Sequence, residues 1–116
     1  MNSTMQNEVA EFVERYGLDV DVVYRVLDLV SEIGELSKEI LKATDYGNRA
    51  FQPFESWEDE LGDVFFSLIC VANSTGVDLE RALSKALEKY RERIESKRMQ
   101  AREGDEQGPN PPRLRC

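Results

Sequence analysis

Residues 56–75 read SWEDELGDVFFSLICVANST, and this stretch decides the fold. At the helical period of about 100° per residue, its apolar side chains cover roughly half of the circumference. Phe66 and Cys70 lie on the opposite side of the helix, so that side is partly apolar as well. The polar remainder is a narrow strip of four residues, Glu60, Asp63, Ser67 and Ser74. A helix that is apolar nearly all round must be buried nearly all round, which three other helices of a small domain cannot achieve. We therefore expect a second copy of the chain to cover part of this helix.

Three further segments show the helical spacing of apolar residues: about 4–16, about 19–46, and from residue 78 onward. Ser3 and Gln6 have the spacing of a capping box, and Gly17 is suited to end the first helix. No strand pattern competes with these periods. The predicted fold class is all-α: a protomer of four to five helices joined by short turns and completed by oligomerisation.

The length of 116 residues leaves room for one domain, which we expect over residues 1–99. Residues 100–116 are polar and contain three of the four prolines. The period of apolar residues is lost there, so we expect a disordered tail.

Composition excludes several kinds of chemistry. The chain has no His, so it has no imidazole base and no His metal ligand. Its two cysteines, Cys70 and Cys116, are too few and too far apart for a four-cysteine zinc site. The net charge of −8 disfavours binding to nucleic acid. No apolar run is long enough to span a membrane and no signal peptide is visible, so we expect a cytoplasmic protein without membrane contact.

Two acidic pairs carry the candidate chemistry: Glu32-x-x-Glu35 and Glu60-x-x-Asp63. Residues at i and i+3 are neighbours on a helix, so two such pairs on facing helices would bring four carboxylates together. Four anions at that range need a compensating cation. Oxygen ligands without His or Cys suit Mg²⁺ first and Mn²⁺ second.

A plainer interpretation stands beside this one. Taken alone, Glu32 and Glu35 are more typical of a solvated helix face than of a site. A glycine lies inside each pair, Gly34 in the first and Gly62 in the second. Gly within a helix costs about 1 kcal/mol of stability relative to Ala. Close approach of a second helix or room for a ligand would explain the two glycines. The alternative function is a non-enzymatic helical oligomerisation or regulatory module.

Three segments together resemble a known family: SEIGEL, EDELGDVFFSLICVAN and GVDLERALSKALEKYRER. They resemble the MazG-like nucleotide pyrophosphohydrolases of the all-α NTP pyrophosphatase superfamily over about residues 20–95. The resemblance implies a helical protomer that forms a homodimer or homotetramer, and Mg²⁺ bound by the four carboxylates. It also implies hydrolysis of (deoxy)nucleoside triphosphates at the α-phosphorus to a monophosphate and pyrophosphate.

Within that resemblance, Glu32 or Glu35 is the catalytic carboxylate that orients or deprotonates water. Two positions depart from the family pattern: Ser31 stands where many members have a further Glu, and Tyr90 stands near an expected phosphate-binding Asn. The superfamily also contains dUTPases and phosphoribosyl-ATP pyrophosphohydrolases, so either nucleotide is an alternative substrate.

Five further residues are candidate substrate contacts. The basic ones are Lys38, Lys85 and Lys89. The alternative for Lys38 is an ion pair with Asp45 or Glu39, and the alternative for Lys85 and Lys89 is a solvated helix face. The aromatic ones are Phe51 and Trp57, which flank the loop before residue 60 and could stack on the base. Trp57 is also the first core position of its helix, and the period favours that interpretation.

Overall fold

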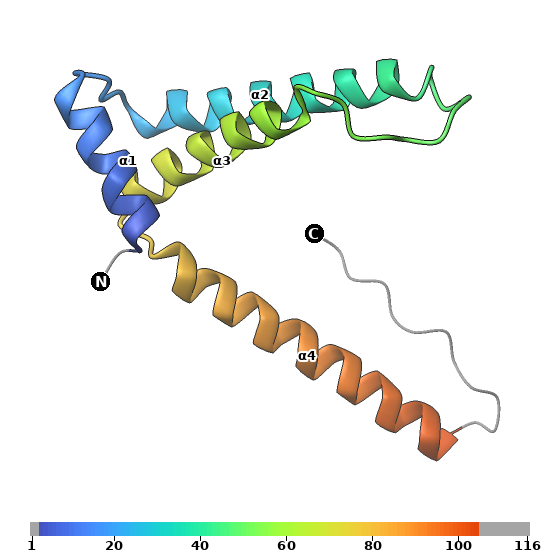
Figure 1. The fold of residues 1–116 in the computed structure, drawn as a ribbon. Coiled ribbons are helices and arrows are strands. Elements are labelled where there is room, and N and C mark those ends of the chain that lie inside the picture. The colour runs from blue at the N-terminus through green and yellow to red at the C-terminus, as the bar shows by residue number, and fades with distance from the viewer. Residues whose placement is uncertain (1–2, 105–116) are drawn as a thin grey trace. The chain divides into compact units, whose positions relative to one another are not determined.

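A computed structural model describes residues 3–104, and within this range it contains four helices and no strand (Figure 1). The helices are α1 (Thr4–Arg15), α2 (Val22–Ala43), α3 (Trp57–Ser74) and α4 (Leu79–Gly104). The predicted all-α class is therefore confirmed. The chain divides between Leu79 and Glu80 into two units, the first containing α1, α2 and α3.

Side chains cap the first turns of α1 and α2, but not the first turn of α3. Ser3 Oγ accepts a hydrogen bond from the Gln6 backbone N at 3.2 Å, and Asp21 Oδ1 accepts one from the Val23 backbone N at 2.9 Å. These bonds satisfy amides that have no partner within the helix. Ser56 occupies the capping position of α3, but its side chain makes no capping hydrogen bond.

The turn after α2 is built from consecutive left-handed residues. Asp45, Tyr46 and Gly47 have φ values of 48°, 54° and 92°. The Tyr46 backbone N donates to the Leu41 carbonyl at 2.7 Å, and the Arg49 backbone N donates to the Thr44 carbonyl at 2.8 Å. These bonds close the carboxyl end of α2 and turn the chain back toward α3.

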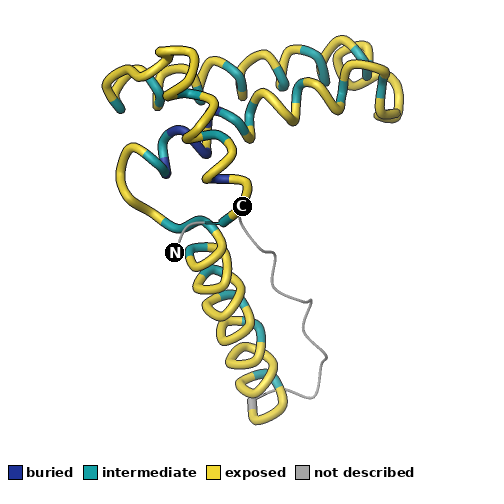
Figure 2. Tube along the Cα trace, turned by 60° about the vertical axis from the view of Figure 1, so that its left-hand side comes forward, coloured by how far each residue is buried: buried dark blue, intermediate teal, exposed yellow. Residues whose placement is uncertain are grey.

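In the first unit, α2 and α3 lie side by side in opposite directions, and α1 packs against α3 (Figure 1). The buried positions of the described chain gather on α3 and at one residue of α1 (Figure 2). They are Gln6, Ser67, Ile69, Cys70 and Ala72. This core is small for a chain of this length.

Gln6 fixes α1 to the far end of α3. It is 1% exposed, and its Nε2 donates to Asn73 Oδ1 at 3.1 Å and to the Val77 carbonyl at 2.7 Å. Its Oε1 accepts a hydrogen bond from the Leu79 backbone N at 2.8 Å. The Gln6 side chain therefore makes long-range contacts that the capping-box spacing did not predict.

The chain covers α2 on one side only. Leu29, Leu36 and Ile40 are half-buried, whereas Val30 and Ile33 are 61% and 46% exposed. All five belong to the helical period of apolar residues in this segment. Apolar residues extend around more of α2 than a single partner helix can cover.

The helix α4 extends five residues past the predicted domain end at residue 99, to Gly104. The rest of the predicted tail, residues 105–116, lies outside the described residues. Within α4, Lys89 Nζ lies 5.1 Å from the centre of the Tyr90 ring, a cation–π distance. Across the described residues, every helix is too short or too polar to span a bilayer.

Candidate metal site

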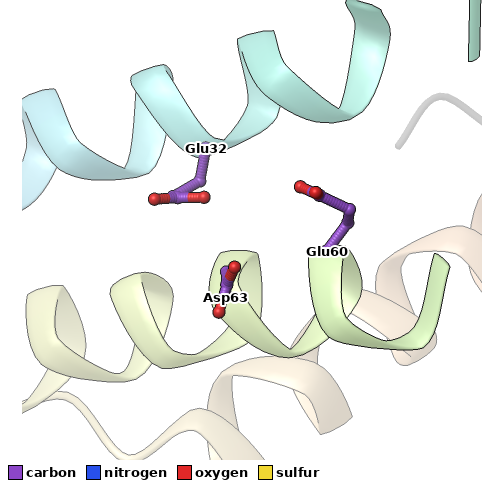
Figure 3. A group of neighbouring side chains, drawn as sticks. All are labelled: Glu32, Glu60 and Asp63. Carbon is purple, nitrogen blue, oxygen red and sulfur yellow. The ribbon is translucent and has the colours of Figure 1, made fainter. Parts of the chain in front are cut away.

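Three carboxylates from two helices meet in the first unit: Glu32 of α2, and Glu60 and Asp63 of α3 (Figure 3). One carboxylate oxygen from each residue lies within 4.8 Å of the other two. Glu32 and Glu60 are half-buried, and Asp63 is exposed. Three oxygens at this spacing can converge on one small cation.

The helix packing accounts for this convergence. Glu60 and Asp63 are one turn apart on α3, so their side chains leave the same face of that helix. Glu32 lies between Leu29 and Leu36 on the half-buried face of α2, which packs against α3. The structure therefore places Glu32 at the contact between the two helices.

The electrostatics of the site centre on Glu60. Partial loss of solvent raises the pKa of Glu60 above its ordinary value of 4.5, and the negative charges of Asp63, Glu39, Glu32 and Glu35 raise it further. A cation beside these carboxylates would stabilise the anionic form of Glu60. The donors are all hard oxygens, and the three carboxylates therefore fit a small divalent cation.

The remaining predicted residues on α2 are less central. Glu35 is exposed and lies outside the group of three, although its negative charge also raises the pKa of Glu60. Lys38 is exposed one turn beyond Glu35. The negative charge of Glu39 raises the pKa of Glu60, and Glu39 Oε1 lies 3.9 Å from Lys42 Nζ. The sequence did not single out Glu39. Its position seven residues after Glu32, and so on the same helix face, is the signal that could have found it.

The loop between the acidic helices carries a cluster of three aromatic rings. Phe51, Phe54 and Trp57 lie edge to face, with ring centres 5.1–6.3 Å apart. Phe54 and Trp57 are half-buried, and Phe51 is 36% exposed. Trp57 thus packs with the loop, and it lies one turn of α3 before Glu60.

The two glycines of the acidic pairs have free space around them. A Cβ built on Gly34 or Gly62 meets no heavy atom within 4 Å among the described residues. Within this part of the chain, neither glycine is therefore explained by close approach of a second helix. The predicted contacts Lys85 and Lys89 lie on α4, in the second unit, and stay predictions.

Cys70 belongs to a different part of the first unit. It is 4% exposed and lines a small cavity together with six other residues, Ala10, Val13, Asp19, Arg25, Asn73 and Ser74. Burial raises the pKa of the Cys70 thiol, while Arg25 lowers it and Asp28 raises it. A buried thiol with a raised pKa is a poor nucleophile, so Cys70 is a packing residue.

Comparison with known proteins identifies the family of this chain. The model of the MazG nucleotide pyrophosphohydrolase domain matches residues 24–97, which include both acidic pairs. The YpjD protein of Bacillus subtilis strain 168 is 32% identical over 99 residues, which are 83% of this chain and 85% of that protein.

Two crystal structures have the same fold. The structure of YpjD from Bacillus subtilis matches with a TM-score of 0.63 and 30% identity, over 78% of this chain and 92% of that one. A Bacillus-conserved MazG protein, a nucleotide pyrophosphohydrolase, matches with a TM-score of 0.62 and 34% identity, over 74% of this chain and 84% of that one. The chain therefore belongs to the MazG family of nucleotide pyrophosphohydrolases.

Proposed function

We propose that the protein hydrolyses (deoxy)nucleoside triphosphates at the α-phosphorus, releasing a nucleoside monophosphate and pyrophosphate. The observation that carries the proposal is the convergence of Glu32, Glu60 and Asp63 within 4.8 Å across two helices. Family membership supplies the reaction class. A surface with the net charge of this chain would repel a triphosphate, so the carboxylates need a cation between themselves and the substrate.

We propose Mg²⁺ as that cation, with Mn²⁺ as a substitute. Glu32, Glu60 and Asp63 would hold it, and Glu35 would complete the set from the next turn of α2. When bound, the ion neutralises charge on the triphosphate and on the departing pyrophosphate.

The chain must also activate water without a His residue. We assign this task to the pair Glu32 and Glu35, one of which accepts a proton from the attacking water. The water oxygen forms the new bond to the α-phosphorus, and the bond from that phosphorus to the bridging oxygen breaks. Glu35 is exposed and lies outside the group of three, so its carboxylate is accessible to water.

Substrate binding uses the surroundings of the site. Lys38, one turn beyond Glu35, would supply positive charge for the phosphates. Lys85 and Lys89 of α4 stay candidate phosphate contacts from the sequence alone. Phe51 and Trp57 supply aromatic surface for the base. The base and sugar stay open, with dUTP and phosphoribosyl-ATP among the candidates.

We also propose that the working form is a homodimer or homotetramer in the cytoplasm. The support for association is the set of apolar residues of α2 that are 43–61% exposed, namely Val23, Val26, Leu27, Val30 and Ile33. An exposed apolar stripe of this length marks an interaction surface.

Pyrophosphate release from a panel of canonical and modified (d)NTPs, measured with Mg²⁺, Mn²⁺ or EDTA, tests the proposal. We expect metal-dependent pyrophosphate with at least one nucleotide, and loss of that product in Glu60→Gln. Glu58→Gln, an exposed carboxylate of the same helix outside the group of three, is the matched control. A folded oligomer that releases no pyrophosphate from any nucleotide would contradict the proposed activity.

A further inference from the structure

The helix α1 is attached to the first unit by few buried side chains. Gln6 is the one buried residue of α1, Val9 and Val13 are half-buried, and the other residues of this helix are exposed. An isolated helix of 12 residues is marginal in water, so α1 depends on its contacts with α3 to stay folded. A segment with so little buried apolar surface can open while the rest of a protein stays folded.

The contacts of Gln6 hold α1 in its closed position. Its Nε2 donates to Asn73 Oδ1 and to the Val77 carbonyl, and its Oε1 accepts a hydrogen bond from the Leu79 backbone N. In return, Asn73 Nδ2 donates to the Gln6 carbonyl. Because Gln6 is buried, water can replace these partners only when α1 moves away from α3. The hydrogen bonds are therefore made and broken together.

The same movement would uncover Cys70 of α3. Cys70 is 4% exposed, and it lines a cavity of about 160 Å³. Ala10 and Val13 of α1 form part of the cavity wall, and so does Asn73, the partner of Gln6. When α1 leaves α3, this part of the wall is lost. Breaking the contacts of Gln6 and opening the cavity beside the thiol are thus one event.

We propose that α1 is a strap that opens and closes on α3 by local unfolding, with Gln6 as its latch, and that its opening controls access to the Cys70 cavity. Because α2 and α3 pack directly against each other, the strap can open while these two helices stay folded. The inference is independent of the proposed metal site and of the proposed hydrolysis.

Reaction of the Cys70 thiol with dithionitrobenzoate, a disulfide reagent, measures the opening. Full-length Cys116→Ser protein has Cys70 as its single thiol. The Cys70 thiolate attacks the reagent, forms a mixed disulfide and releases a coloured thiolate. We expect the rate to change little at low urea concentration, because the opening of α1 exposes little surface. A rate that rises with urea as steeply as global unfolding does would overturn the strap.

Gln6→Ala in the same background tests the latch. Cys70 should react at least about tenfold faster, because the closed state loses three long-range hydrogen bonds and the open state loses none. Asn7→Ala changes an exposed neighbour on α1 and should alter the rate by less than about twofold. Equal rates in the two variants would overturn the role of Gln6 as the latch.

Hydrogen exchange of the wild-type protein tests the strap without any substitution. Amides of α1 should be at least about tenfold less protected than those of residues 67–72, where the buried positions of α3 lie. Mass spectrometry of peptides from the two segments gives the comparison. Equal protection would show that α1 opens only when the whole protein unfolds, and it would overturn the proposal even if Gln6→Ala does not fold.

Discussion

Gln6 of α1 and Asn73 of α3 exchange hydrogen bonds across 67 residues of sequence. Gln6 Nε2 donates to Asn73 Oδ1 at 3.1 Å, and Asn73 Nδ2 donates to the Gln6 backbone carbonyl at 3.0 Å. Gln6 also binds backbone groups of Val77 and Leu79. A buried amide that uses both its donors and its acceptor holds α1 in one orientation on α3.

Gln6→Ala should therefore destabilise the fold. The substitution removes three long-range side-chain hydrogen bonds and leaves buried partners unsatisfied, so we expect a loss of about 2–4 kcal/mol in the free energy of unfolding. Urea denaturation followed by circular dichroism measures it. Asn7→Ala, an exposed neighbour on α1, should cost less than about 0.5 kcal/mol. Equal losses in the two variants would show that the hydrogen bonds of Gln6 are not what secures α1.

The raised pKa of Glu60 predicts a pH dependence of metal-free stability. Burial and neighbouring carboxylates raise this pKa in the folded protein, so the folded state binds the proton more tightly than the unfolded state does. The resulting stabilisation is complete below the ordinary value of 4.5 and is lost as pH rises through the raised pKa. In EDTA, Glu60→Gln should be more stable than the wild type above this range. The difference should shrink as pH falls through it. Urea midpoints between about pH 4 and pH 8 would measure this, and a constant difference would contradict the electrostatic account.

Gly34→Ala and Gly62→Ala should separate stability from activity. A Cβ at either position meets nothing within 4 Å, so each variant should gain about 0.5–1 kcal/mol from helix propensity. If the free space is room for substrate, pyrophosphate release should fall in the same variants. Thermal denaturation and pyrophosphate release are the two measurements. Full activity in both variants would rule out substrate access as the reason for these glycines.

Trp57 is the single Trp of the chain, and it reports on the aromatic cluster. Addition of nucleotide with Mg²⁺ should change its fluorescence, because a stacked base alters the surroundings of the indole. Phe51→Ala should weaken nucleotide binding by about tenfold, the range measured for loss of one stacking ring. Tyr46→Ala, at an exposed position of the preceding turn, is the matched control and should have little effect. If fluorescence does not respond and Phe51→Ala binds normally, the cluster serves only to pack the loop.

The positions of the helices could be predicted from the sequence because helix formation depends on local signals. The Ser3 cap and the apolar periods placed the starts of α1, α3 and α4 within a residue or two. The packed face of α2 was harder to predict. Apolar residues such as Val30 and Ile33 extend around that helix, and the period alone does not say which side meets α3. Gln6 was assigned to a local cap because its partners Asn73, Val77 and Leu79 are far away in sequence.

The candidate site was likewise predictable only in part. Glu60 and Asp63 were predicted from one helix, whose single polar strip leaves few alternatives. Glu32 was predicted from spacing, but its place at the contact with α3 depends on how two helices pack. Glu39 was missed because an acidic residue beside a Lys is typical of a solvated surface, and only the burial of its side chain distinguishes it.

The left-handed turn at Asp45, Tyr46 and Gly47 determines how residues on α2 are matched with residues on α3. Because this turn fixes where α2 ends, every residue before it has a set angular position about the helix. One residue inserted between Glu32 and the turn would rotate Glu32 by about 100° relative to Asp63, and would move it by about 1.5 Å along the axis. Evolution of this protein can therefore change the length of the segment after Gly47 more freely than the length of the segment before Asp45.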